Sequence, residues 1–147
     1  MIITKSIEID MGHRVPNHKS KCKNLHGHRY RIEVGVDGEV ISEKGSSKEG
    51  MVIDFGDLKE IMLDSINKVF DHSLIVYGED EFKILFEELR KRGQKINFVP
   101  FIPTAENIAK HFYDIMKESL EKVSIKIKFV KVFETPTSMA QYSEEIT

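Results

Sequence analysis

The sequence predicts an α+β domain in which helices cover one face of an antiparallel sheet. Apolar and polar residues alternate near both ends of the chain, as they do in strands with one buried face. In the middle, apolar residues recur every three to four positions, as they do in amphipathic helices. The expected order is therefore ββααββ, with a four-stranded sheet and two main helices on one face. The 147 residues suit a single domain over residues 1–147.

Four segments carry the strand pattern: residues 2–10, 28–38, 125–129 and 139–146. The second alternates most regularly, and its large apolar side chains share one face: Tyr30, Ile32, Val34 and Val36. Residues 41–50 are polar and contain two glycines, so we expect a flexible loop there.

Helix-capping residues mark where the helices begin. Asp54 is placed to cap a helix that ends near Phe70, and Thr104, directly after Pro103, is placed to cap a second one. Between them, residues 79–93 carry a shorter apolar period that closes on a glycine, which predicts a third, smaller helix.

Three histidines near the start of the chain form a candidate metal site. His26 and His28 flank a glycine, and an extended backbone sends residues i and i+2 to the same face. With His13 from the preceding strand they would supply three imidazoles to one ion. Three protein ligands with an open fourth position is the pattern of a catalytic zinc centre, so we expect Zn²⁺ as the cofactor.

Three other residues bear on this hypothesis. His18 is an alternative third ligand, although it lies in a polar stretch that we expect to be a loop. His111 lies off the apolar stripe of its helix and is interpreted as a surface or boundary histidine. Cys22, the only cysteine, cannot form an intramolecular disulfide and is well placed to be a reactive thiol.

Composition narrows the class of protein. The formal net charge of −2 offers no global basic field, so we expect no nucleic-acid partner. No apolar run approaches the roughly 20 residues of a membrane span, and the first residues lack the apolar core of a signal peptide. These features, with a single cysteine, predict a cytoplasmic protein with no membrane partner.

Six segments in order resemble the 6-pyruvoyl-tetrahydropterin synthase / 6-carboxytetrahydropterin synthase family. They are Gly12-His13-Arg14, Cys22-x-x-x-His26-Gly27-His28, Gly50-Met51-Val52-Ile53-Asp54-Phe55-x-x-Leu58-Lys59, Phe70-Asp71-His72, Pro103-Thr104-Ala105-Glu106-Asn107 and Val132-Phe133-Glu134-Thr135. The resemblance implies the T-fold and an assembly of trimers stacked into hexamers, with active sites between subunits.

The resemblance also implies roles for individual residues. The family's three zinc ligands fall on His13, His26 and His28, and its catalytic cysteine falls on Cys22. Its proton-transferring pair falls on Asp71 and His72. The glutamate that holds the pterin ring falls on Glu134, and Thr104 and Glu106 receive a supporting role at the substrate.

The implied substrate is 7,8-dihydroneopterin triphosphate. The pattern is most similar to the 6-carboxy-5,6,7,8-tetrahydropterin synthases of the queuosine (7-deazaguanine) pathway, which release acetaldehyde and triphosphate. A 6-pyruvoyl-tetrahydropterin synthase and a non-catalytic pterin- or zinc-binding T-fold protein are the alternatives. A branch serving folate synthesis is disfavoured by Cys22, because it tends to have a glutamate near that position. Compared with the smallest family members, an inserted segment is expected at about residues 77–102.

Overall fold

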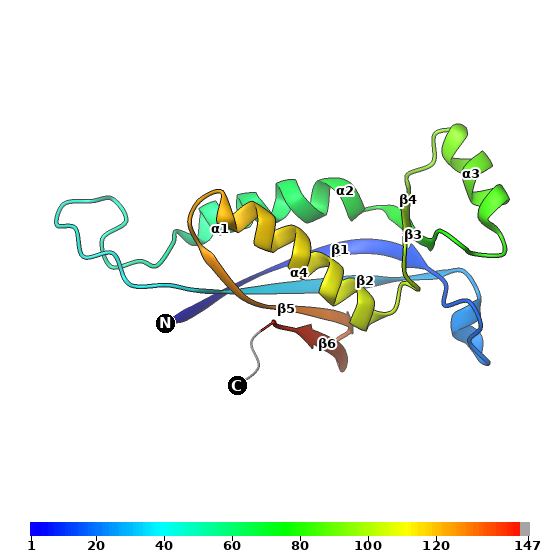
Figure 1. The fold of residues 1–147 in the computed structure, drawn as a ribbon, viewed down its shortest axis with the longest axis horizontal. Helices are drawn as coiled ribbons and strands as arrows, with labels where there is room; N and C mark the ends of the chain where they lie inside the picture. Colours follow the sequence, from blue (N-terminus) through cyan, green and yellow to red (C-terminus); the bar gives the residue numbers. More distant parts are fainter. Residues whose placement is uncertain (145–147) are drawn as a thin grey trace.

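A computed structural model, which describes residues 1–144, contains one six-stranded sheet with the strand order β4-β3-β1-β2-β5-β6 (Figure 1). The strands are β1 (Ile2–His13), β2 (His26–Asp37), β3 (Ser73–Tyr77), β4 (Ile96–Val99), β5 (Lys126–Thr135) and β6 (Ser138–Tyr142). The two central strands pair antiparallel over twelve residues each, and β5 and β6 continue the antiparallel part.

The α+β class is confirmed, but the expectation of a four-stranded, purely antiparallel sheet was wrong. β3 runs parallel to β1, and β4 runs parallel to β3. Parallel neighbours need a crossover connection, which the helix between β3 and β4 supplies. Each missed strand is an apolar run of only four or five residues, and such runs show too little periodicity to distinguish strand from helix. The last predicted strand ends at Tyr142, and Ile146 lies outside the described residues.

The predicted helix starts are confirmed. The helices are α1 (Phe55–Met62), α2 (Lys68–Phe70), α3 (Lys83–Lys91) and α4 (Ala105–Glu121). The Asp54 carboxylate accepts the backbone N–H of Gly56 at 2.7 Å, and the Thr104 hydroxyl accepts that of Asn107 at 3.3 Å. The predicted helix after Asp54 is divided, because a π-helical turn at Leu63–Asn67 separates α1 from α2.

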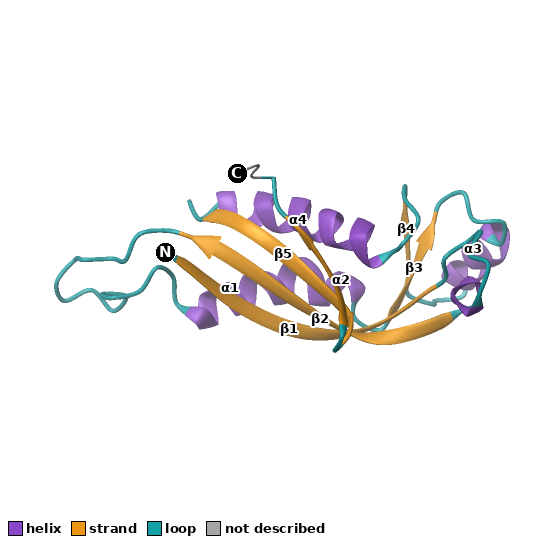
Figure 2. Ribbon diagram, turned by 90° about the horizontal axis from the view of Figure 1, so that it is seen from below, coloured by secondary structure: helices purple, strands orange, loops and turns teal. Residues whose placement is uncertain are grey.

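The helices α1, α2 and α4 lie on one face of the sheet (Figures 1 and 2). That face is the predicted apolar one: the side chains of Tyr30, Ile32, Val34 and Val36 are fully buried. Helix α3 stands apart at one end of the molecule, where Val76, Phe86 and Ile96 form a second, smaller core. Phe86 and Ile96 of that core lie in the segment 77–102.

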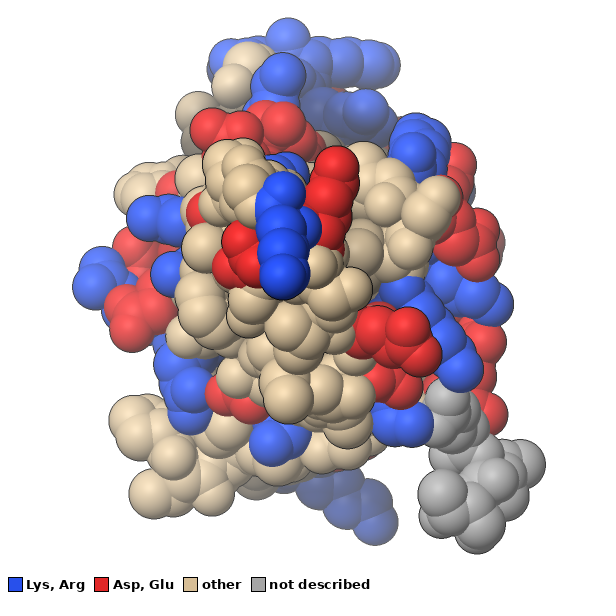
Figure 3. Space-filling model, turned by 90° about the vertical axis from the view of Figure 1, so that its left-hand side faces the viewer, with Lys and Arg blue, Asp and Glu red and all other residues tan. Residues whose placement is uncertain are grey.

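The end of the molecule opposite α3 carries the loop between β2 and α1. In the view of Figure 3, positive and negative side chains are interspersed around uncharged surface, so this face presents no continuous basic patch. Among the described residues, no helix combines the length and the apolar character that crossing a bilayer requires.

Replacing Phe86 by alanine should cost about 3–5 kcal/mol of unfolding free energy, because it empties the centre of the smaller core. Ile84→Ala on the same helix is the matched control: Ile84 is 82% exposed, so its truncation should change stability by less than about 0.5 kcal/mol. Denaturant titration measures both variants. Equal stability of the two would contradict the packing of α3 against β3 and β4.

Candidate active site

Three imidazoles converge where β1 ends and β2 begins. The antiparallel register places His13 opposite His26 and Met11 opposite His28, so all three histidines project from the helix-covered face of the sheet. Their ring centroids lie 4.6–5.3 Å apart, and one ring nitrogen from each falls within 4.8 Å of the others. The predicted three-histidine cluster is therefore present in the structure.

Gly27, between the two histidines of β2, allows β1 and β2 to approach closely here. A side chain at Gly27 would meet the carbonyl oxygen of Met11 at 3.1 Å and the Cα of Gly12 at 3.5 Å. Backbone atoms cannot move aside as a flexible side chain can. The glycine thus keeps the strand pairing that brings His13 to His26.

Backbone carbonyls fix the orientation of two of the imidazoles. His13 Nδ1 lies 2.7 Å from the oxygen of Pro103, and His26 Nδ1 lies 2.7 Å from that of Asn24. Because a carbonyl oxygen only accepts, each Nδ1 must carry the proton and donate it. In neutral rings this leaves an Nε2 lone pair on each, and the two Nε2 atoms are 3.1 Å apart. Two facing lone pairs at this distance repel each other unless they share a cation.

The third imidazole also presents a nitrogen that needs a partner such as a cation. His28 Nε2 is buried and has no hydrogen-bond partner among the described residues. Burial lowers the pKa of His28, an effect that His13 and His26 reinforce and Glu134 opposes, so its neutral, ligating form is favoured. The His28 Nε2 atom makes no hydrogen bond with any described residue and lies next to the two lone pairs of His13 and His26, so the three nitrogens form a donor set that a divalent metal ion satisfies.

Glu134 on β5 reaches into the same cluster. Its Oε1 lies 3.2 Å from His13 Nε2 and 3.3 Å from His28 Nε2. His13, which donates a hydrogen bond to the carboxylate whenever its ring is protonated, lowers the pKa of the Glu134 carboxyl and outweighs the opposing effect of burial, so the group is ionised at neutral pH. Sequence reasoning placed Glu134 at the substrate, and the structure adds that its carboxylate contacts two of the candidate metal ligands.

Tyr30 lies beneath the cluster and was not predicted to belong to it. Its ring packs edge-on against His28 at 5.5 Å and His13 at 6.0 Å, and its hydroxyl is buried. Burial and the Glu134 charge raise the pKa of Tyr30, which keeps the hydroxyl protonated. The signal in the sequence was the alternation that puts residues 26, 28 and 30 on one face. The carbonyls of Pro103 and Asn24 left no such signal, because backbone groups carry no residue-specific pattern.

Cys22 and His18 lie in the loop between β1 and β2. Cys22 occupies a 3₁₀ turn, Lys21–Lys23, and is half-buried. His18 is exposed, and its Nδ1 accepts the backbone N–H of Ser20 at 3.0 Å. Neither residue joins the group of ligand atoms formed by the three imidazoles, so His18 does not replace His13 in the cluster. His111 is partly buried against the rings of Phe70 and Phe101, as expected of a boundary residue.

The pair Asp71–His72 is not brought to the cluster. His72 Nδ1 lies 2.9 Å from Asp71 Oδ2, so the predicted pairing exists. However, both residues group with Asp10, whose side chain alternates with Ile9 and Met11 and projects from the opposite face of the sheet. Burial would raise the pKa of Asp71, but hydrogen bonds from the Asp10 backbone and from His72 hold it below its ordinary value.

Thr104 and Glu106 lie at the start of α4, beside the cluster. Pro103, whose carbonyl accepts from His13, directly precedes Thr104. The Thr104 hydroxyl is engaged in capping α4, and Glu106 is exposed in the first turn. Thr104 therefore directly follows the residue whose carbonyl binds His13, and Glu106 lies two residues further along the chain.

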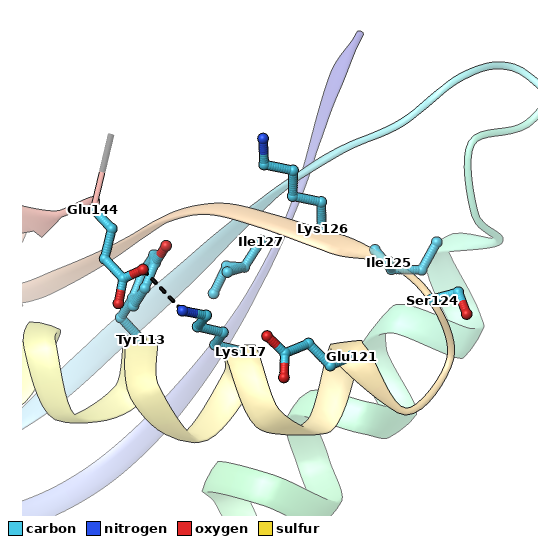
Figure 4. Close-up of a pocket in the computed structure, with 8 residues that line it drawn as sticks. All are labelled: Tyr113, Lys117, Glu121, Ser124, Ile125, Lys126, Ile127 and Glu144. Carbon is cyan, nitrogen blue, oxygen red and sulfur yellow. Dashed lines mark hydrogen bonds and ion pairs between the residues drawn. The ribbon is translucent and has the colours of Figure 1, made fainter. Parts of the chain in front are cut away.

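A depression of about 570 Å³ lies between the end of α4 and β5 (Figure 4). Lys117 and Glu144 pair across it at 2.9 Å. It lies at the end of α4 remote from Pro103, roughly 20 Å along the helix at 1.5 Å per residue. Its described lining includes no histidine or cysteine, so it offers no group of candidate zinc ligands like the three histidines.

Comparison with known proteins agrees with the motifs. Residues 2–145 match the family model of 6-pyruvoyl tetrahydropterin synthase. The chain is 37% identical to the 6-carboxy-5,6,7,8-tetrahydropterin synthase of Rickettsia bellii, covering 94% of this chain and 96% of that protein. It is 36% identical to the enzyme of the same name from Haemophilus influenzae, covering 97% and 98%.

Solved structures share the fold. An uncharacterized protein of Wolinella succinogenes superposes with a TM-score of 0.79 at 23% identity, covering 99% of this chain and 98% of that one. The 6-pyruvoyl tetrahydropterin synthase of Caenorhabditis elegans gives a TM-score of 0.68 at 23% identity, covering 99% and 96%. The family-model match over nearly the whole length establishes that this chain belongs to the 6-pyruvoyl tetrahydropterin synthase family.

Proposed function

We propose that this protein is a zinc-dependent 6-carboxy-5,6,7,8-tetrahydropterin synthase. It would convert 7,8-dihydroneopterin triphosphate to 6-carboxytetrahydropterin, with release of acetaldehyde and triphosphate. The observation that carries the proposal is the convergence of three imidazoles beside the Glu134 carboxylate. The near full-length similarity to relatives named for this activity supports the choice of product.

The donor set fits zinc. His13, His26 and His28 would hold the ion through Nε2, with the Nδ1 protons of the first two donated to backbone carbonyls. Two nitrogens bound tetrahedrally at 2.0–2.1 Å stand about 3.3–3.4 Å apart, close to the 3.1 Å between the Nε2 atoms of His13 and His26. When bound, zinc would supply Lewis acidity to oxygens of the substrate side chain.

The protein's own groups would bind the ring and move the protons. The ionised Glu134 carboxylate can accept two hydrogen bonds from the aminopyrimidinone edge of a pterin, which orients the ring. The Cys22 sulfur would remove a proton from the side chain, since a thiolate is an effective base near neutral pH. Thr104 and Glu106, at the start of α4, would support the bound substrate.

His72 would transfer the second proton to or from the substrate side chain. Because Asp71 engages Nδ1, the Nε2 of His72 is the atom available for transfer, and the carboxylate fixes the tautomer. In one chain this pair and the histidine cluster lie on opposite faces of the sheet. A complete site would therefore combine His13, His26 and His28 of one subunit with Asp71 and His72 of another, in a homo-oligomer.

Product analysis tests the reaction. Incubation of the zinc-loaded protein with 7,8-dihydroneopterin triphosphate should yield 6-carboxytetrahydropterin and acetaldehyde, both identified by mass spectrometry. A product that retains all three side-chain carbons would instead assign 6-pyruvoyl-tetrahydropterin synthase activity. Stoichiometric pterin binding without turnover would assign a non-catalytic pterin-binding protein.

Metal content tests the ligands. Purified protein should contain about one zinc per chain, and His26→Ala should lose most of it, because two remaining imidazoles bind far more weakly than three. His18→Ala, in the loop that precedes β2 and outside the cluster, should keep its full zinc content. Elemental analysis measures both, and a fully loaded His26→Ala protein would disprove the assignment.

Substitution of Glu134 by glutamine separates ring binding from chemistry. The amide would present a donor to ring N–H groups, so pterin affinity should fall by about 2–5 kcal/mol as a charge-assisted pair is lost. Zinc content should not change if Glu134 serves the substrate alone. Calorimetric titration with the pterin product measures the affinity; a variant with normal affinity and reduced zinc would make Glu134 a metal ligand instead.

Mixing two inactive variants tests the shared site. Cys22→Ala and His72→Ala should each be inactive alone. After the two are unfolded and refolded together, random assembly should return up to about a quarter of wild-type activity, since that share of sites receives an intact half from each chain. Each variant refolded alone is the control. Mixed oligomers without activity would place the whole site within one chain.

A further inference from the structure

A buried ion pair joins the loop that carries Cys22 to the segment 77–102. Arg14 Nη1 donates to both carboxylate oxygens of Asp80, at 2.7 Å each. The Arg14 side chain is 7% exposed and that of Asp80 is fully buried. The two residues are 66 positions apart in sequence, and nothing in the sequence pattern pointed to their pairing.

Each partner is held by further contacts. Asp80 Oδ1 also accepts the backbone N–H of Phe82 at 2.8 Å, which fixes the carboxylate at the entrance to α3. The Phe82 ring lies under the Arg14 guanidinium, 4.8 Å from ring centroid to Cζ. Glu81 contacts Arg14 as well, at 3.3 Å, but its side chain is 70% exposed and contributes little.

On its other side, Arg14 is tied to the neighbourhood of Cys22. Arg14 Nε donates to the carbonyl of Lys23 at 2.9 Å, and the next residue, Val15, donates its backbone N–H to the carbonyl of Cys22 at 2.8 Å. Arg14 and Val15 thus hold the backbone carbonyls of both Cys22 and Lys23. One guanidinium therefore connects the cysteine-bearing turn with the start of α3, which lie at the same end of the molecule (Figures 1 and 2).

The same loop is fixed to the metal ligands at both of its ends. Arg14 directly follows His13, and Asn24, directly after the 3₁₀ turn, accepts the Nδ1 proton of His26. The loop position consequently sets where the Cys22 thiol stands relative to the imidazoles.

We infer that Arg14 and Asp80 are positioning residues: through the Lys23 carbonyl they fix the position of the Cys22 turn relative to the strand ends that carry the three histidines. This gives the segment 77–102 a role in catalysis, as the support of the loop that carries the proposed base. The inference rests on the proposed function of Cys22. It identifies residues that act on that cysteine without contacting substrate.

Asp80→Asn tests the inference, because asparagine keeps the shape and one oxygen but not the ionic, two-oxygen grip. The loosened turn should expose the thiol, so iodoacetamide should alkylate Cys22 about fivefold faster or more. Turnover should fall about 10- to 100-fold, as expected for a misplaced catalytic group, while KM stays within about threefold and zinc content is unchanged. Glu81→Gln is the matched control and should match the wild type in all four measurements.

Arg14→Lys provides a second variant that keeps the charge but removes the fork that contacts Asp80 and Lys23 together. It should show the same faster alkylation and lower turnover. The single variant Asp80→Glu keeps the carboxylate, so its alkylation rate and turnover should lie closer to the wild type than those of Asp80→Asn. A folded Asp80→Asn or Arg14→Lys protein with wild-type alkylation and turnover would reduce the ion pair to a purely structural role and overturn the inference.

If neither variant folds, hydrogen exchange on the wild-type protein decides. The amides of Val15 and Phe82 should then show protection factors within about threefold of each other, because one opening event releases both. A Val15 amide that exchanges orders of magnitude faster than Phe82 would overturn the inference. Alkylation and hydrogen exchange need no substrate, so they test the positioning role even if the proposed reaction were wrong.

Discussion

The antiparallel register between β1 and β2 determines both the packing of the core and the geometry of the three-histidine cluster. Ile7 pairs with Ile32 and Ile9 with Tyr30, which directs large apolar side chains toward the helices. The same alternation, continued to the strand ends, directs His13 and its partner His26 to that face. A slip of one residue would turn every one of these side chains over. The buried area of the core thus selects the register that also assembles the three imidazoles.

The two faces of the sheet carry different chemistry for the same reason. Beneath the helices, the apolar layer ends at the imidazoles. One of them, His13, donates a hydrogen bond to the Pro103 carbonyl at the start of α4. On the other face, Arg29 pairs with Asp10 at 3.0 Å and Arg31 with Glu33 at 3.1 Å. A charged surface of this kind gains little from a covering helix, because burying it would require every charge to be desolvated. It suits water or another polar surface, and it borders the Asp71–His72 pair that the proposed site needs from a second chain.

Sequence reasoning succeeded where a signal is local. Alternation in β2, the caps at Asp54 and Thr104, and the spacing of His26 and His28 each depend on a few consecutive residues, and each is present in the structure. It failed where the decisive partner is distant. β3 and β4 are strands only because a sheet edge is available to them, and their short apolar runs do not reveal that edge.

The site shows the same division. The convergence of His26 and His28 could be predicted from their spacing, and the family resemblance added His13. The faces on which Asp71 and His72 lie could not be predicted, because they follow from the parallel pairing of β3 with β1. The hydrogen bond that the Asp10 backbone N–H donates to Asp71 Oδ1 is a consequence of that pairing. Carbonyl partners such as that of Asn24 are equally hidden, since any residue type can supply one.

The ion pair between Arg14 and Asp80 illustrates why a fold retains a costly contact. Desolvating two charges offsets most of their attraction, so a buried pair adds little net stability compared with apolar side chains of similar volume. What it adds is direction: a carboxylate held by Phe82 and a planar guanidinium admit few relative orientations, whereas apolar contacts admit many. A turn that carries the proposed base needs that restriction more than it needs stability. The loop that carries Cys22 has no regular strand or α-helix of its own to fix it. The ion pair, which joins the start of α3 to the Lys23 carbonyl, fixes this loop relative to α3 instead.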